Sequence, residues 1–183
     1  MCKIALMIAP GCEEIEALTV TDILRRANIT LDMISITDEP KATGSHGITF
    51  ETDADIADAD FAGYDAIVLP GGMPGTTNLG ANATVVAQIK EFAANGKTVA
   101  AICAAPTVLG ANGLLEGKKA TCYPGLEDKL TGAEKLTDEV VIDGNIITSR
   151  GMGTAIPFAL ALVARFTDEA AAKKLGEGIV YKR

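Results

Sequence analysis

The chain of 183 residues is 48% hydrophobic and 22% charged, a composition typical of a soluble globular protein. Its net charge of −8 and its scattered basic residues argue against a nucleic-acid or anionic-membrane surface, because phosphate binding uses clustered Lys and Arg. The length suits a single domain, predicted over residues 1–183. The apolar stretch at the start is too short for a signal peptide or a membrane span, which favours a cytoplasmic location.

The first third of the chain alternates apolar runs with helix-like periodicity. We predict a strand at 3–9, an amphipathic helix at about 13–27, a second strand at 30–36, a hairpin or edge strands at 41–51, and a solvated connection at 53–61. The acidic connection lacks the Gly and the terminal Glu of a calcium loop, so no metal site is predicted there.

The rest of the chain continues the alternation of strands and helices. The predicted elements are a strand at 65–69, a helix at 83–94, a strand at 98–102, a helix at 104–109, a short strand at 119–122, a hairpin at 139–149 and a helical region from about 154. This order predicts an α/β fold with a mostly parallel sheet, helices on both faces and an added antiparallel hairpin. No internal repeat or linker divides the chain.

Ligands of such sheets bind at the carboxyl ends of the strands. Three loops are expected there: residues 9–16, 70–75 and 102–106. Glycines such as Gly71 and Gly72 let the backbone approach a ligand and present N–H donors, although an ordinary strand-to-helix turn would contain them equally well. Neither a GxGxxG nor a GxxxxGK[ST] motif occurs, which argues against a dinucleotide or P-loop site.

Cys103 falls in the turn between the strand at 98–102 and the following helix. Free N–H groups and the positive end of a helix dipole stabilise an anion there, so the turn is expected to lower the thiol pKa from about 8.5 to roughly 6. The alternative is a buried filler, because free cysteine commonly packs as a small hydrophobe.

Glu16 is the candidate partner of this cysteine. It shares one face of the first helix with apolar residues, namely Val20, Ile23, Leu24 and Ala27. A half-buried Glu has a raised pKa and can donate a hydrogen bond to a thiolate or carry a proton. The alternative is a side chain that bends to solvent, whereas Glu13 and Glu14 are explained as first-turn charges that favour the dipole.

His46 is the only histidine, and it lies in the predicted hairpin. A Cys–His dyad would require that loop to reach Cys103, and no G-x-S-x-G elbow is present, so a cysteine peptidase is disfavoured and His46 is interpreted as a loop residue. The other cysteines, Cys2, Cys12 and Cys122, form no Cys-x-x-Cys pair, which indicates reduced thiols and neither a zinc site nor a disulfide scaffold. Cys12 or Cys122 would resolve an oxidised Cys103 as a disulfide only if it were exposed nearby; packing is the simpler role.

Four segments, "EEIEALTVTDILRRA", "YDAIVLPGGMPGTTNL", "VAAICAAPTVL" and "GNIITSRGMGTAIPFALALV", carry a resemblance over essentially the whole chain. The chain resembles the ThiJ/PfpI superfamily and, within it, the DJ-one and YajL-like branch. The resemblance implies a flavodoxin-like three-layer sandwich and a homodimer. It also implies that Cys103 is a nucleophile-elbow cysteine, that Glu16 hydrogen-bonds it, and that the N–H groups of Gly72 and Ala104 form an oxyanion site.

Two departures from the family pattern bear on the chemistry. Ala104 stands where the peptidase branch has a histidine, and "CYP" replaces the common "THP", so that Tyr123 occupies the place of a histidine. Proton transfer by that imidazole is unavailable; the Tyr123 hydroxyl can bind a substrate carbonyl but is a poor base at neutral pH. Arg150 is expected either to orient an anionic substrate or to support the dimer surface.

The resemblance therefore points to a cysteine-dependent enzyme that acts on α-oxoaldehydes. A glyoxalase would convert methylglyoxal to lactate without a cofactor or a metal, and a deglycase would act on early glycation adducts of proteins. The alternative is a redox-sensing stress chaperone that responds to oxidative stress. In such a protein Cys103 forms a sulfinic acid, and there is little catalysis. An amide hydrolase is opposed by the missing imidazole.

Overall fold

A computed structural model describes residues 2–182; Met1 and Arg183, the two ends of the predicted domain, lie outside the described residues. Its main sheet has seven strands in the order β10-β11-β7-β6-β1-β2-β5. Their bounds are β1 (Lys3–Ile8), β2 (Thr30–Ser35), β5 (Ala54–Asp55), β6 (Ala66–Leu69), β7 (Thr98–Ile102), β10 (Val140–Asp143) and β11 (Ile146–Ser149). All neighbouring pairs are parallel except the hairpin of β10 and β11, which confirms the predicted mixed sheet.

The sheet is buried on both faces because its central strands β1, β6 and β7 are apolar except at the first position of β1 (Lys3) and of β7 (Thr98). In β1, Ile4 and Leu6 face one hydrophobic cluster, while Ala5 and Met7 face the other. A strand that alternates between two cores is a continuous apolar run in sequence, which is why the central strands were predictable. Strands β7 and β6 follow the same rule, and all their residues are buried.

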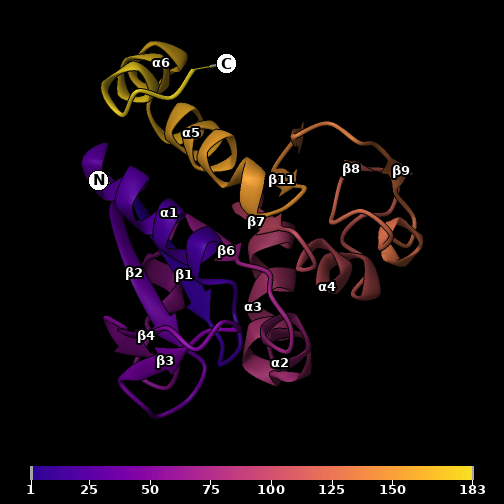
Figure 1. The fold of residues 1–183 in the computed structure, drawn as a ribbon. Helices are drawn as coiled ribbons and strands as arrows, with labels where there is room; N and C mark the ends of the chain where they lie inside the picture. Colours follow the sequence, from indigo (N-terminus) through magenta and orange to yellow (C-terminus); the bar gives the residue numbers. More distant parts are fainter. Residues whose placement is uncertain (1, 183) are drawn as a thin grey trace.

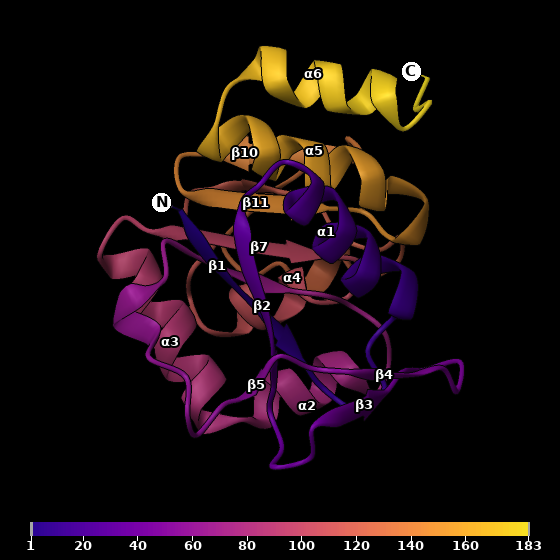
Figure 2. The same ribbon diagram turned by 90° about the vertical axis from the view of Figure 1, so that its left-hand side faces the viewer.

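Helices cover both faces and complete the three layers. They are α1 (Glu14–Arg26), α2 (Gly75–Ala81), α3 (Ala83–Ala94), α4 (Pro106–Ala111), α5 (Ala155–Phe166) and α6 (Glu169–Gly178), with single 3₁₀ turns η1 (Phe61–Gly63), η2 (Glu127–Lys129) and η3 (Met152–Thr154). Helices α1 and α5 pack on one face, with α6 against α5, whereas α2, α3 and α4 cover the other face (Figures 1 and 2). No helix among residues 2–182 is both long and apolar enough to cross a membrane.

Two small sheets lie outside the main one. Strands β3 (Lys41–Thr43) and β4 (Thr49–Glu51) form the predicted hairpin, and β8 (Lys119–Ala120) pairs in parallel with β9 (Glu134–Lys135). The predicted strand at 119–122 is therefore shorter than expected and does not join the main sheet; Thr121 instead bonds to the side chain of Thr148. The segment at 53–61 is not only a solvated connection, because β5 lies in it and adds the edge strand beside β2.

Local chemistry explains where the helices near the strand ends begin. The Glu13 carboxylate accepts the N–H of Glu16 at 2.7 Å, so α1 begins at Glu14, close to the predicted start. Helix α4 begins at Pro106, two residues later than predicted, because Cys103 to Ala105 form a turn. Helix α2 was missed in the sequence because its Gly and Thr residues have weak helix propensity.

Candidate active site

The three loops expected at the carboxyl ends of the strands do converge, and backbone hydrogen bonds join the first loop to the second. The N–H of Glu13 donates to the carbonyl of Gly71 at 2.9 Å, and the N–H of Gly75 donates to the carbonyl of Gly11 at 3.0 Å. These loops pack so closely that a Cβ on Gly72 would lie 2.3 Å from the Glu13 nitrogen. Glycine is therefore required sterically where the second loop meets the first.

Cys103 occupies a strained turn directly after β7. Its φ of +65° lies in the left-handed region, which costs a non-glycine residue on the order of 1–3 kcal/mol. Two hydrogen bonds hold this conformation: the Cys103 N–H donates to Ser149 at 2.9 Å, and its carbonyl accepts the N–H of Tyr123 at 2.8 Å. A Cβ on Gly71 would lie 2.6 Å from the Cβ of Cys103, so the opposing loop also fixes the side chain. The turn therefore presents the thiol in one orientation.

The N–H groups of Gly72 and Ala104 face the Cys103 sulfur and act to lower the pKa of the thiol. Two converging donors can also bind an oxygen that becomes negative when a nucleophile attacks a carbonyl. Their part in catalysis stays a prediction.

Glu16 lies beside the thiol and is completely buried, at 0% exposure, rather than half-buried as predicted. Its Oε2 accepts the N–H of Gly71 at 2.8 Å. Its Oε1 has no partner of good hydrogen-bond geometry among the described residues, although the Cys103 thiol is close enough to act on the carboxyl group as a hydrogen-bond donor. The thiol is therefore the polar group available to this oxygen, and the alternative of a solvent-facing Glu16 is wrong.

The two side chains shift each other's protonation. Burial raises the pKa of Glu16 from 4.5 to about 7, although the Gly71 N–H and the Cys103 thiol oppose the rise. Burial also raises the pKa of Cys103 to about 12; the charge of Glu16 and the hydrogen bond to it add to the rise, while the Gly72 and Ala104 N–H groups oppose it. The prediction that the turn alone lowers the thiol pKa is therefore wrong.

The pair nevertheless provides a route to the thiolate. Between about pH 7 and pH 12 the two groups together hold one proton, and interacting groups of this kind titrate as a unit. When this proton moves from sulfur to carboxylate, a thiolate forms beside a neutral acid and the net charge of the site is unchanged. Neutral Glu16 no longer repels the thiolate and can donate a hydrogen bond to it.

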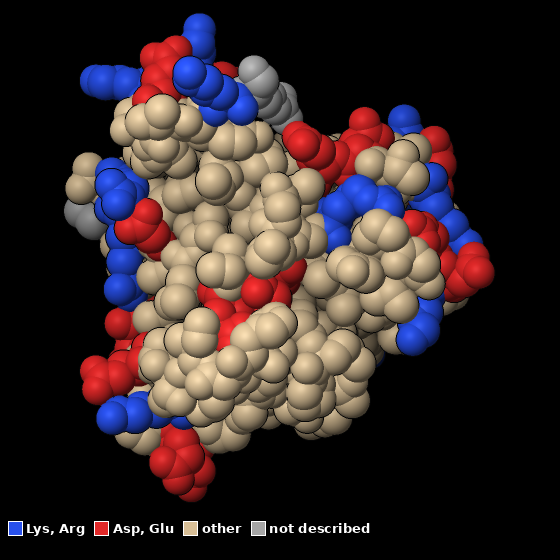
Figure 3. All heavy atoms as spheres, viewed as in Figure 1, with Lys and Arg blue, Asp and Glu red and all other residues tan. Residues whose placement is uncertain are grey.

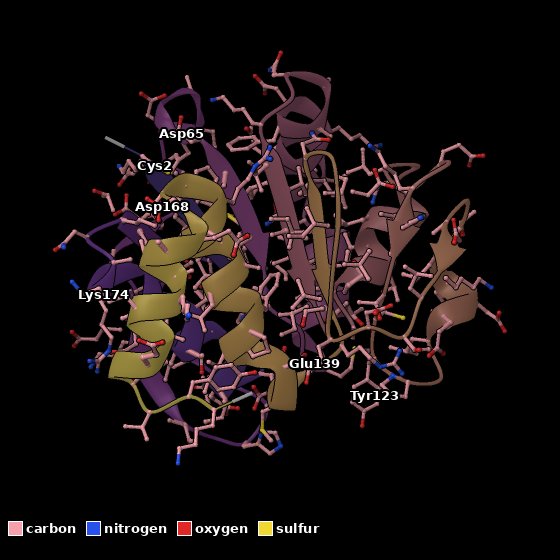
Figure 4. The ribbon with its side chains drawn as sticks, turned by 90° about the horizontal axis from the view of Figure 1, so that it is seen from above. Cys2, Asp65, Tyr123, Glu139, Asp168 and Lys174 are labelled. Atoms are coloured by element: carbon pink, nitrogen blue, oxygen red, sulfur yellow. The ribbon has the colours of Figure 1, made fainter. Side chains whose placement is uncertain are left out.

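Tyr123 is a further neighbour of the thiol, in addition to Glu16 and the two N–H donors. A Cβ on Gly151 would lie 3.4 Å from the Tyr123 ring and 3.9 Å from the Cys103 sulfur, so these three residues are neighbours. The Tyr123 side chain is 52% exposed and projects from the edge of the molecule (Figure 4). Its hydroxyl is thus placed at the rim of the site, and its predicted contact with a substrate carbonyl remains untested.

Arg150 lies behind this rim with its charge already paired. Its guanidinium contacts Glu127 at 3.3 Å and the hydroxyl of Thr121 at 3.5 Å. These contacts tie β11 to the segment that carries Tyr123. The structure thus gives Arg150 a supporting contact, while its predicted roles toward substrate and dimer stay predictions.

Sequence reasoning missed the role of Glu14, which is buried rather than a simple first-turn charge. Its carboxylate accepts the N–H of His46 at 2.7 Å and lies 3.0 Å from the His46 ring. Burial disfavours the charged carboxyl, but the bonds to His46 and Ile48 outweigh it and lower the Glu14 pKa to about 2. Glu14 in turn raises the pKa of His46. His46 is thus a loop residue, as predicted, and it anchors the hairpin to the start of α1.

Glu13, Glu14 and His46 also form a group of potential metal ligands, with one ligand atom from each lying within 4.8 Å of the others. Both acids already serve the fold, however, because Glu13 caps α1 and Glu14 holds the hairpin. Metal binding would have to displace these bonds.

The other three cysteines are poorly suited to exchange with Cys103. Cys12 and Cys122 are fully buried, and burial raises their pKa values to about 12 and about 11. Burial and the nearby Asp65 raise the pKa of Cys2 to about 11. These environments favour packing over disulfide resolution for Cys12 and Cys122.

Comparison with known proteins shows the family of the chain. The family model described as "DJ-1/PfpI family" matches residues 2–165 of the chain. Among curated relatives, Protein dj-1beta of Drosophila melanogaster is 36% identical over 183 residues, covering 98% of both chains. Glutathione-independent glyoxalase DJR-1.2 of Caenorhabditis elegans is 35% identical over 165 residues, covering 88% of this chain and 87% of the relative.

Solved structures agree with the sequence matches. The structure of Toxoplasma gondii DJ-1 in an oxidized form has a TM-score of 0.96 and 35% identity, and all of both chains is covered. Some relatives are longer: the chain spans 38% and 45% of the length of the DJ-1 homologs B and A of Arabidopsis thaliana. The sheet, the flanking helices and these matches confirm the predicted flavodoxin-like sandwich. The chain belongs to the DJ-1/PfpI family.

Proposed function

We propose that this protein is an enzyme that uses Cys103 to process α-oxoaldehydes, as a cofactor-independent glyoxalase or as a deglycase. One observation carries the proposal: the Cys103 thiol is fixed between a buried carboxyl group, Glu16, and two N–H donors, Gly72 and Ala104. The similarity to a relative named a glutathione-independent glyoxalase supports the substrate class.

The first step forms a covalent adduct. After its proton has moved to Glu16, the Cys103 sulfur attacks the aldehyde carbon, a C–S bond forms, and the carbonyl electrons move to oxygen. The N–H groups of Gly72 and Ala104 stabilise this oxyanion until Glu16 returns the proton to it. The product of this step is a neutral hemithioacetal, and Glu16 is again a carboxylate.

The later steps move one hydrogen and add water. Glu16 takes the proton from the former aldehyde carbon, which forms an enediolate, and returns it to the neighbouring carbon, while the hydroxyl proton on the first carbon moves to the oxygen of the second. The first carbon is thereby oxidised to a thioester and the second reduced to an alcohol, so no external oxidant is needed. Water then cleaves the C–S bond, which releases a 2-hydroxy acid and regenerates Cys103. At an early adduct on a protein amine or thiol, the Cys103 sulfur would replace that group on the same carbon: a C–S bond to Cys103 forms, the bond from this carbon to the amine or thiol breaks, and Glu16 gives its proton to the leaving group.

Methylglyoxal consumption by wild type and Cys103→Ser tests this proposal. We expect wild type to form lactate without an added cofactor, and Cys103→Ser to form none above the uncatalysed rate. Cys122→Ser is the matched control, because it removes a buried thiol outside the proposed chemistry. Equal consumption by wild type and Cys103→Ser would overturn the proposal.

We further propose that the chain acts as a cytoplasmic homodimer. Three apolar side chains, Ile15, Ile48 and Met152, are 48 to 55% exposed, and an interface between two copies of the chain would remove such side chains from water. Figure 3 shows acidic side chains at the centre of a largely uncharged area, with charged side chains of both signs around its edges. The four free cysteines suit a reducing compartment. Light scattering should report a dimer for wild type and a monomer for Ile48→Glu; a monomeric wild type would contradict the proposal.

A redox-sensing chaperone is the second candidate, favoured by the similarity to the oxidized Toxoplasma gondii structure. Two equivalents of peroxide would convert the Cys103 thiol to a sulfinate, releasing two waters, and the Gly72 and Ala104 N–H groups can bind the anion. Mild peroxide should add two oxygen atoms to wild type and none to Cys103→Ser in intact-mass spectra. Oxidation spread evenly over the other cysteines would count against this function.

A further inference from the structure

A groove between α2 and α4 begins at Ala104, the residue that follows Cys103. Its cavity volume is about 280 Å³, and its walls include Met73, Thr76, Ala104, Thr107, Leu126 and Lys129. Two of these residues directly follow site residues, since Met73 comes after Gly72 and Ala104 comes after Cys103. The groove therefore begins beside the two N–H donors of the thiol. Apart from these N–H donors, the mechanism proposed above involves no group of the groove.

Lys129 gives the groove its charge. It is the one charged residue of the lining, and it forms no ion pair with any residue from 2 to 182. The acids next to it in sequence are engaged elsewhere, because Glu127 pairs with Arg150 and Asp128 pairs with Lys135. An unpaired cation thus lines this groove in a chain whose net charge is −8. Such a cation attracts a negatively charged ligand group.

Hydroxyl groups and size further define what the groove fits. Thr76 is buried at 5% exposure, and its hydroxyl has no hydrogen-bond partner among the described residues. The Thr107 hydroxyl already donates to the carbonyl of Ala104 at 2.7 Å. The cavity is close to the lower end of the roughly 300–1,000 Å³ that small-molecule sites occupy. Methylglyoxal is small enough to react at the thiol and leave this space unfilled.

We propose that the α2–α4 groove is a subsite for substrates that carry a carboxylate on a short chain, with the reacting carbonyl at Cys103 and the carboxylate at Lys129. The inference rests on the proposed function for the identity of the reacting group. Within the proposed substrate class it predicts a preference for acidic α-oxoaldehydes and acidic glycation adducts, and it gives Lys129 the role of selecting them.

Alkylation of Cys103 by two matched probes tests the subsite without requiring turnover. The probes are the iodoacetamide of γ-aminobutyric acid, which ends in a carboxylate, and N-propyl iodoacetamide, which has the same chain without it. At low ionic strength we expect the ratio of the two rate constants, acidic over neutral, to fall about 2- to 5-fold in Lys129→Met, the range expected for one partly exposed charge. Lys129→Glu should lower the ratio further. Lys90→Met on α3, a lysine outside the groove, should leave the ratio at the wild-type value.

The outcomes separate this inference from the proposed function. A ratio that is the same in wild type, Lys129→Met and Lys129→Glu overturns the subsite even if wild type converts methylglyoxal to lactate. A ratio that falls as expected supports the subsite, and a failure to convert methylglyoxal would then refute only the proposed function. Equal falls in Lys129→Met and Lys90→Met would also overturn the subsite, because they would reflect overall charge.

Discussion

Replacement of Glu16 by Gln tests whether this carboxyl and Cys103 share a proton. Glutamine has the same shape and can still accept the Gly71 N–H, but it has no charge to lose or gain. Burial raises the pKa of Glu16 from 4.5 to about 7, which corresponds to about 3 kcal/mol by which the ionised carboxyl destabilises the fold. Since the side chain is completely buried, solvent screening does not reduce this figure substantially.

The sign of the pH dependence follows from the raised pKa. Between pH 4.5 and pH 7 the folded protein holds a proton on Glu16 that the unfolded chain has released, so stability falls as the pH rises through this window. Relative to Glu16→Gln, the free energy of unfolding of wild type should therefore drop by about 3 kcal/mol from about pH 4 to about pH 8. Urea denaturation at a series of pH values measures this difference.

The same substitution should change the reactivity of the thiol. In wild type, Glu16 and Cys103 together lose their first proton with an apparent pKa of about 7, and the thiolate can form only after this loss. The rate of Cys103 alkylation should therefore rise around this pH and then level off. Glu16→Gln should lose that step, whereas Glu91→Gln on α3 should keep it. An apparent pKa near the 8.5 of an ordinary cysteine in wild type and Glu16→Gln alike, or a stability difference independent of pH, would refute proton sharing.

Three other substitutions test neighbouring parts of the site. Gly151→Ala would place a methyl group 3.9 Å from the Cys103 sulfur, so alkylation of Cys103 should slow severalfold. The extended backbone of Gly151 suits alanine, so urea denaturation should show a loss of unfolding free energy below about 1 kcal/mol. Glu14→Gln should cost about 1–3 kcal/mol at pH 7 by weakening its bonds to His46, and the loss should shrink as the pH falls from 4.5 toward 2, where Glu14 itself becomes protonated. Thr76→Val removes a buried hydroxyl without a partner and should stabilise the protein by about 1 kcal/mol, seen as a higher melting temperature; a loss of stability would show that the hydroxyl is satisfied.

The main sheet was predictable because its signals are local. A buried parallel strand is a continuous apolar run, and the helix at Ala83–Ala94 and the strand at Thr98–Ile102 have the predicted bounds. The short strands were less predictable. Two-residue strands such as β5 and β8 depend on where neighbouring segments lie, and no pattern within so few residues can specify the partner.

The residues of the candidate site could be predicted from the sequence, whereas their pKa values could not. The apolar stripe of α1 placed Glu16 toward the core, and the family resemblance paired it with Cys103. The pKa of the thiol depends on depth of burial and on the charge beside it, which only the folded arrangement provides. Glu14 was missed for the same reason, because its partner His46 comes from a hairpin 32 residues away.

The most direct test of the central claim is the fate of methylglyoxal in D₂O, followed by proton NMR. If Cys103 and Glu16 carry out the reaction, wild type should produce lactate that contains solvent deuterium on its second carbon, because the proton held by Glu16 can exchange with solvent before it is returned. Cys103→Ser should produce no lactate above the uncatalysed rate. Methylglyoxal left unchanged by wild type, or the same lactate formed by Cys103→Ser, would contradict the account.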